Sequence, residues 1–152
     1  MANDLNAIAD LYLTALTAWR ENRGGGLAGM RSVINVIQNG ARKHNRSAYE
    51  ECTKRARYSS ISMPGPEAYL WPVAGDQMMA AALDTASQAL SGNLADVTEG
   101  ATLYYAPKGI GETTKTFTKP DGTQVPFPQH WDPDEVVFTV EIENQLFFKE
   151  KR

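Results

Sequence analysis

Glu21 is the residue of this sequence best placed for proton-transfer chemistry. It stands near the end of a predicted helix, just before residues 24–26, which are all glycine. At about 100° per residue it lies roughly 160° from Leu5, on the face opposite the first apolar stripe. The negative end of a helix disfavours a carboxylate, which suits a general acid for glycosidic oxygen, whereas Arg20 and Arg23 favour ionisation. The balance stays open, and an ordinary solvated glutamate is the alternative interpretation.

Composition and cysteine content indicate a folded protein of ordinary size. The chain has 152 residues, of which 42% are hydrophobic and 22% charged, so we expect a single domain over residues 1–152 and favour a monomer. Cys52 is the only cysteine, and His44 and His130 lie far apart. We therefore expect no internal disulfide and no metal site. The sequence shows no signal peptide and no membrane-spanning run, which predicts synthesis into the cytoplasm without stable membrane association.

Basic residues gather in the middle of the chain. Residues 20–58 contain nine Lys or Arg and three acids, which leaves a charge of +6 on this segment. Such a segment can face an anionic polymer, such as nucleic acid or cell wall, or simply form solvated helix faces. Few aromatic residues alternate with the basic ones and no nucleic-acid-binding motif is present, so we do not expect a nucleic-acid partner.

The first 92 residues have the periodicity of helices. Asn3 or Asp4 can cap the first helix, which residues 24–26 end. Its apolar positions follow helical spacing and are expected to point inward: Leu5, Ile8, Tyr12, Ala15 and Trp19. Further helices are predicted over residues 27–40, over 47–57 with a capping box at the start, and over 76–92, with an ordered loop over 58–72.

The last third of the chain has the pattern of short strands. A strand is predicted over 102–105, a hairpin over 113–127 around the turn Pro120-Asp121-Gly122, and a second pair of strands over 136–143 and 146–149. Helices first and strands later, without alternation of the two, indicate an α+β fold.

The segment around Glu21 resembles the opening of the SleB-type (spore-cortex-lytic) cell-wall hydrolases. That family reads roughly G-E-A-R-G-E, then an E-G-Q turn, then a V-A-A-V-I-x-N-R helix. Glu21 falls on the catalytic glutamate of the family, Arg23 and Gly24 on its R-G, Gly29 on its turn glycine and Asn39 on its helix-end asparagine.

Three later blocks keep the order of the family. Residues 58–60, Tyr-Ser-Ser, resemble its F-[ST] segment, and residues 96–107 resemble its D-P-T-x-G-A-x-x-Y-Y-x-P block. Residues 142–147 resemble its terminal I-G-N-H-x-F pair of strands, with Trp131 upstream where the family has a tryptophan. The departures are Asn22 for Ala, Gly25 for the second Glu, Leu103 for an aromatic residue or His, and Gln145 for the terminal His. Residues 111–127 look like an insertion.

The resemblance implies a lysozyme-like α+β domain, with N-terminal helices followed by short antiparallel strands and hairpins. It implies an enzyme that cleaves the MurNAc–GlcNAc bond of peptidoglycan glycan strands, commonly by lytic transglycosylation, with Glu21 as the one catalytic residue and with no metal or cofactor. The residues that it places at the substrate are Arg23, Ser59, Ser60, Tyr104, Tyr105 and Trp131. Those with a structural or orienting role are Gly24, Gly29 and Asn39. The aromatic residues suit pyranose rings, although each can instead fill the core.

Two interpretations of function remain. The first is a phage-type lysin that accumulates in the cytoplasm and reaches the cell wall through a separate pore. The second is a non-catalytic glycan-binding or phage structural protein that keeps the fold. The departures at Gly25 and Gln145 are the reason to consider the second.

Overall fold

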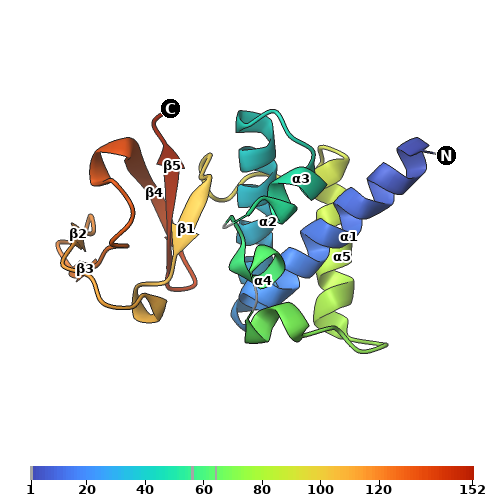
Figure 1. Ribbon diagram of the computed structural model, residues 1–152, viewed down its shortest axis with the longest axis horizontal. Coiled ribbons are helices and arrows are strands. Elements are labelled where there is room, and N and C mark those ends of the chain that lie inside the picture. Colours follow the sequence, from blue (N-terminus) through green and yellow to red (C-terminus); the bar gives the residue numbers. More distant parts are fainter. Residues whose placement is uncertain (1, 56, 64) are drawn as a thin grey trace.

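The computed structural model describes residues 2–55, 57–63 and 65–152. Helices occupy the first part of the chain and short antiparallel strands the second, and the two groups lie side by side (Figure 1). The α+β arrangement predicted from the sequence is therefore confirmed. We call residues 2–92 the helical lobe and residues 101–152 the strand lobe.

Three long helices build the helical lobe: α1 (Ala2–Asn22), α2 (Gly26–Lys43) and α5 (Gln77–Leu90). Two short helices, α3 (Ala48–Thr53) and α4 (Ser59–Ser62), and two 3-10 turns, Arg23–Gly25 and Pro66–Tyr69, complete it. The buried side chains that the three long helices share include Leu16, Trp19, Met30, Val33, Ile34, Ile37, Met79 and Ala82. Cys52 of α3 is fully buried beside them. Among the described residues, no helix is long and apolar enough to cross a membrane.

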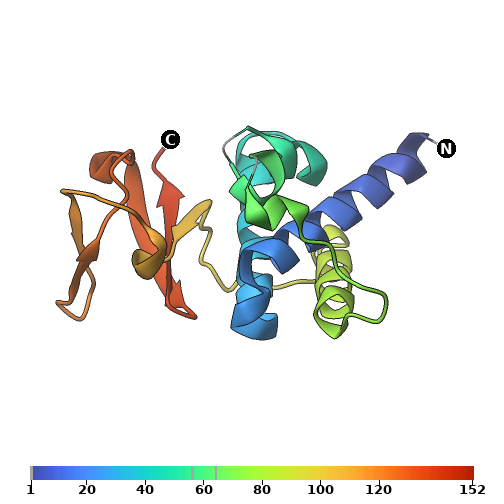
Figure 2. The same cartoon turned by 60° about the horizontal axis from the view of Figure 1, so that its bottom comes forward.

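One expectation about the first helix and one about the third were wrong. Leu5 and Ile8 are 64% and 61% exposed, because the first turns of α1 project beyond the other helices (Figure 2). The predicted inward stripe therefore holds only from the middle of α1 onward, where Ala15 and Trp19 are buried. The third helix keeps its predicted capping box but ends at Thr53, because the next residue has extended backbone with ψ 126°.

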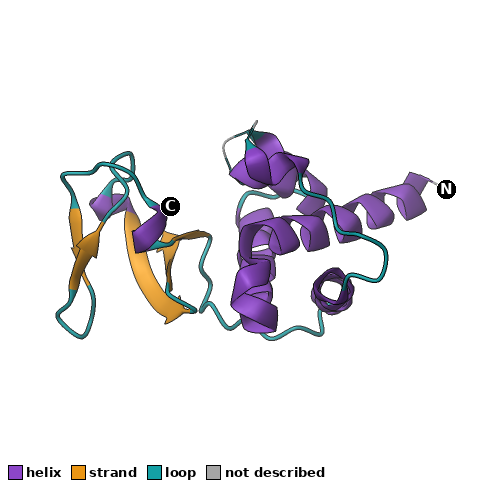
Figure 3. Ribbon diagram, turned by 90° about the horizontal axis from the view of Figure 1, so that it is seen from below, coloured by secondary structure: helices purple, strands orange, loops and turns teal. Residues whose placement is uncertain are grey.

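The strand lobe contains a three-stranded sheet and a separate hairpin. The sheet has the order β1 (Leu103–Tyr105), β5 (Gln145–Glu150), β4 (Val136–Ile142), all antiparallel. The predicted hairpin is present as β2 (Thr116–Thr118) and β3 (Gln124–Pro126). Figure 3 shows the strands gathered on one side of the molecule and the long helices on the other. Aromatic and aliphatic side chains between sheet and hairpin form a second core: Tyr105, Phe127, Leu146 and Phe148.

A third cluster joins the two lobes. Val36 of α2, Ala101 and Phe147 of β5 are buried together. Asn39 lies inside α2 and donates hydrogen bonds to Asp96 and to the Ala101 carbonyl, both at about 3 Å. The expectation that Asn39 ends its helix was wrong, because α2 continues to Lys43. Its amide instead connects α2 to the chain segment that leads into β1.

The turn over residues 96–100 is fixed by one carboxylate. Asp96 accepts hydrogen bonds from the Thr98 and Gly100 amides as well as from Asn39. Burial opposes the ionisation of Asp96, but the hydrogen bonds from Thr98, Asn39 and Gly100 outweigh it and lower the pKa of this carboxyl. These hydrogen bonds fix the backbone of residues 96–100, which lead into β1. Tyr104 lies in β1, four residues after this turn.

Candidate active site

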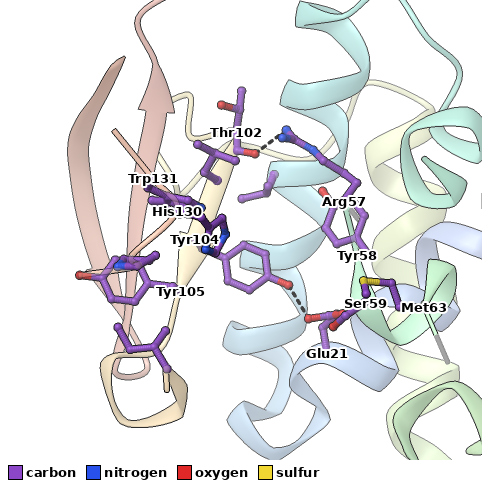
Figure 4. A pocket seen from close by; sticks show the side chains of 14 residues that line it. Glu21, Arg57, Tyr58, Ser59, Met63, Thr102, Tyr104, Tyr105, His130 and Trp131 are labelled. Carbon is purple, nitrogen blue, oxygen red and sulfur yellow. Dashed lines mark hydrogen bonds between the residues drawn. The ribbon is translucent and has the colours of Figure 1, made fainter. Parts of the chain in front are cut away.

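A pocket of about 470 Å³ lies at the junction of the two lobes (Figure 4). The helical lobe contributes the end of α1 and the segment around α4, and the strand lobe contributes β1 and the loop over residues 128–131. Five residues that the sequence analysis selected line this pocket: Glu21, Ser59, Tyr104, Tyr105 and Trp131. Arg57, Tyr58 and His130 line it too, and the sequence analysis gave none of them a role in the site.

The Glu21 carboxylate is held by uncharged donors from both lobes. The Ser60 hydroxyl donates to Oε1 over 2.5 Å, and the Ser60 amide approaches the same oxygen at 3.3 Å. The Tyr104 hydroxyl donates to Oε2 over 2.9 Å, as Figure 4 shows. Within the described part of the chain, Glu21 forms no ion pair with Lys, Arg or His. The carboxylate is therefore positioned by hydroxyl groups and not by a neighbouring positive charge.

Tyr104 is kept in place by stacking and remains a hydrogen-bond donor. Its ring stacks on Phe147 of β5, with 5.5 Å between ring centroids. Burial raises the pKa of Tyr104 well above the ordinary value of 10, and the neighbouring Glu21 raises it further. The phenol therefore keeps its proton at neutral pH and remains a hydrogen-bond donor to Glu21.

Arg20, which precedes Glu21, places Ser60 against it. Its guanidinium donates to the carbonyls of Ser60 and Leu70, each over 3.0 Å, and lies 4.7 Å from the ring centre of Trp71. This buried arginine ties the loop after α4 to the end of α1. The sequence analysis considered Arg20 only for its charge, because partners 40 and 50 residues away leave no local pattern.

The far wall of the pocket is aromatic. The Tyr105 hydroxyl donates to the Pro126 carbonyl over 2.9 Å, and burial raises the pKa of Tyr105 to about 12. The Trp131 ring packs edge-on against Tyr105 and Phe148, at 5.5 and 5.8 Å between ring centroids. Tyr105 and Trp131 therefore line the pocket and also pack in the strand-lobe core.

The other five selected residues lie outside the pocket wall: Arg23, Gly24, Gly29, Asn39 and Ser60. Arg23 stacks on Trp19, with its guanidinium carbon 4.3 Å from the ring centre, and ion-pairs with Glu67 at 3.8 Å. Gly24 is exposed with no atom near its Cβ position, whereas Gly29 is buried against Asn22. Ser60 is buried too, and its hydroxyl is used on Glu21.

Arg57 and Tyr58 form the inner end of the pocket. Arg57 donates to Glu51 and to the Thr102 carbonyl, each over 2.7 Å, and so links α3 to the start of β1. Tyr58 is only 3% exposed, and its hydroxyl has no hydrogen-bond partner among the described residues. Arg57 belonged to a basic run and Tyr58 to a short motif in the sequence, and neither signal indicates burial.

Within the described residues, no group of three or more His, Cys, Asp or Glu side chains is arranged to hold a metal ion. The titratable side chains around the pocket are thus Glu21, Arg57, His130 and the tyrosines. Comparison of the chain with models of known families, with curated proteins and with solved structures finds no match.

Proposed function

We propose that this chain is a peptidoglycan-degrading enzyme with a lysozyme-like fold that cleaves MurNAc–GlcNAc bonds by lytic transglycosylation. Its substrate is the glycan strand of the cell wall, and Glu21 is the catalytic residue. The proposal extends the resemblance to the SleB-type hydrolases.

The observation that carries the proposal is the setting of Glu21. Of the described residues that line the pocket, Glu21 is the only Asp or Glu. Its donors are the hydroxyls of Ser60 and Tyr104, which orient the carboxyl group from the two lobes. Such a group can exchange a proton with a ligand in the pocket.

One carboxyl group is sufficient for the proposed reaction. Protonated Glu21 gives its proton to the glycosidic oxygen as the bond between C1 and that oxygen breaks. The carboxylate then takes the proton of the MurNAc C6 hydroxyl, whose oxygen bonds to C1 and closes a 1,6-anhydro ring. Glu21 ends protonated as it began, and no water is consumed. Glycosidases that hydrolyse the bond normally use two carboxyl groups instead.

The walls of the pocket suit this substrate. Trp131 is half-buried and presents an aromatic surface on the side opposite Glu21, where a sugar ring can pack its C–H face, and the buried Tyr105 packs against it (Figure 4). Ser59 is exposed at the same pocket and can hydrogen-bond sugar hydroxyls. A rival function is glycan binding without catalysis, and the departures at Gly25 and Gln145 favour it.

Mass spectrometry of the muropeptides released from purified sacculi tests the proposal. The wild-type protein is expected to release 1,6-anhydro products, and the Glu21→Gln variant to release none above background. Products with reducing ends would show hydrolysis instead of transglycosylation. Binding to sacculi without any released product would favour the non-catalytic function.

A further inference from the structure

The side chain of Asn22, next to Glu21, is enclosed between two glycines. A Cβ atom on Gly25 would lie 2.7 Å from Asn22 Oδ1, and one on Gly29 would lie 2.6 Å from Nδ2, which is closer than real Cβ atoms approach. Gly25 has φ −82° and ψ 6°, and Gly29 lies within α2, so both backbones are ones that any residue adopts. Glycine at these two positions therefore leaves the space that the Asn22 side chain fills.

The enclosed amide reaches across to the strand lobe. Asn22 Nδ2 donates to Gln145 Oε1 over 2.9 Å, between residues 123 positions apart in the chain. Gln145 is the first residue of β5, and both side chains are half-buried. Asn22, Gly25 and Gln145 are three of the positions at which the sequence departs from the family pattern that it resembles. The structure brings these three departures into contact.

This contact completes a closed series of contacts that includes Glu21 and runs through Asn22, Gln145, Phe147 and Tyr104. Phe147 follows Gln145 by two residues in β5 and stacks on Tyr104. Tyr104 donates to Glu21, and Glu21 is covalently joined to Asn22. Each member of this closed series is thus held from both sides, and the bond between Asn22 and Gln145 links the end of α1 directly to β5.

We propose that Asn22 and Gln145 form a positioning pair that keeps the Tyr104 hydroxyl aligned with the Glu21 carboxylate. This role rests on the proposed function, because alignment affects the rate only if Glu21 transfers the proton. Neither amide touches the reacting atoms. Misplacement of a catalytic group by about 1 Å can cost roughly a factor of 100, so loss of the pair lowers kcat by about ten- to a hundredfold. KM changes by less than about twofold, because the pocket walls stay in place.

Two variants of Gln145 separate a positioning role from a merely structural one. Gln145→Leu has similar size but no acceptor, whereas Gln145→Glu keeps an acceptor for the Asn22 amide. On soluble glycan strands, kcat is expected to fall about tenfold or more for Gln145→Leu and for Asn22→Ala, and to stay within about threefold of wild type for Gln145→Glu. The double variant, Asn22→Ala with Gln145→Leu, is expected to lose no more than either single variant. Thermal unfolding of each variant shows that the assayed protein is folded.

Three results would overturn the positioning pair: wild-type kcat in Gln145→Leu, an equal loss in Gln145→Glu, or losses that multiply in the double variant. Wild-type protein in the same assay separates this inference from the proposed function. If wild type releases no product, the proposed function fails and the positioning role fails with it. If wild type is active and Gln145→Leu is equally active, only the positioning pair is rejected.

Discussion

Glu21 and Glu51 are both withdrawn from solvent, yet their surroundings differ in kind. Glu51 is fully buried and lies within 3.3 Å of nitrogen atoms of Arg57, Arg46 and His44. Glu21 is half-buried, and among the described residues its side-chain donors are Ser60 and Tyr104. Ion pairs with several cations fix Glu51 among buried groups, whereas hydroxyl groups from both lobes orient Glu21 at the wall of a pocket. The first arrangement lies in the packed interior, and under the proposed function the second holds the catalytic group.

Replacement of Glu21 by Gln tests the proposed catalytic role of Glu21, and it has the largest expected effect. Gln keeps the shape of the side chain but has no proton to give to the leaving oxygen. General acid catalysis contributes about 10²- to 10⁴-fold to a rate, so the rate of wall lysis should fall at least about a hundredfold. Thermal unfolding should change little. A folded variant that clears walls at more than about a tenth of the wild-type rate would exclude Glu21 as the catalytic residue.

Replacement of Glu51 by Gln tests the structural role of Glu51 in the same comparison. It leaves the guanidinium groups of Arg57 and Arg46 beside a neutral amide, and breaking a buried ion pair in this way costs about 3–5 kcal/mol. Urea unfolding should show this loss, with Glu112→Gln, at an exposed position, as the control. The protein that remains folded should keep its activity per molecule. An unfolding free energy within about 1 kcal/mol of wild type, a shift ordinary for surface substitutions, would contradict a structural role for Glu51.

Two glycine variants compare how firmly each region is packed. An added Cβ on Gly40 would meet the Glu51 carboxylate and lie 3.2 Å from Arg57 Nη2, inside a cluster in which each group is held by the others. Gly40→Ala should therefore cost about 2–3 kcal/mol, as overpacking of a rigid site does. Gly25→Ala should cost only about 1 kcal/mol, because Asn22 can leave its slot at the loss of one hydrogen bond.

Unfolding by denaturant measures both variants, with Gly24→Ala as the control, since no atom lies near its Cβ position. The second substitution Asn22→Ala should remove the cost of Gly25→Ala and leave that of Gly40→Ala unchanged. Equal costs at Gly25 and Gly40 would mean that the two regions are equally rigid.

The smallest expected effect is at Tyr58, between the two regions. Its buried hydroxyl has no partner among the described residues, and an unpaired buried hydroxyl costs about 1 kcal/mol or more. Tyr58→Phe should therefore raise the melting temperature by roughly 2–4 °C. Tyr69→Phe is the control, because Tyr69 is 72% exposed. A lower melting temperature for Tyr58→Phe would show that the hydroxyl is satisfied.

Tyr58 also predicts a dependence of stability on alkaline pH. Burial raises the pKa of Tyr58 well above 10, so the unfolded chain loses this proton at a lower pH than the folded protein does. Stability is therefore unaffected by this group below about pH 10 and falls as the pH rises above it. The loss between neutral pH and pH 11 should be smaller in Tyr58→Phe than in wild type, as measured by urea unfolding at each pH.

The order of the elements could be predicted from the sequence, because helical periodicity, capping residues and turn residues act locally. The capping box at Ser47 and the turn at residues 120–122 are examples, and both are present. The inward stripe failed at Leu5 and Ile8, since periodicity gives the apolar face of a helix but not the place where a neighbour ends. Tertiary contact decides that point.

The candidate site was only partly predictable for a similar reason. Resemblance selected Glu21 and Tyr104, which the structure joins by a hydrogen bond across 83 residues. It gave no indication that Arg57 would pair with Glu51, or that Asn22 would fill the space left by two glycines. Such contacts depend on distances between elements, and the sequence of each element alone does not contain them.

The buried thiol of Cys52 has a practical consequence. The thiolate is the form that reacts with alkylating reagents, and burial raises the pKa of Cys52 to about 12. At neutral pH the sulfur therefore reacts only during openings of α3 that admit water and reagent. The rate of alkylation of Cys52 therefore reports how often the helical lobe opens locally around α3.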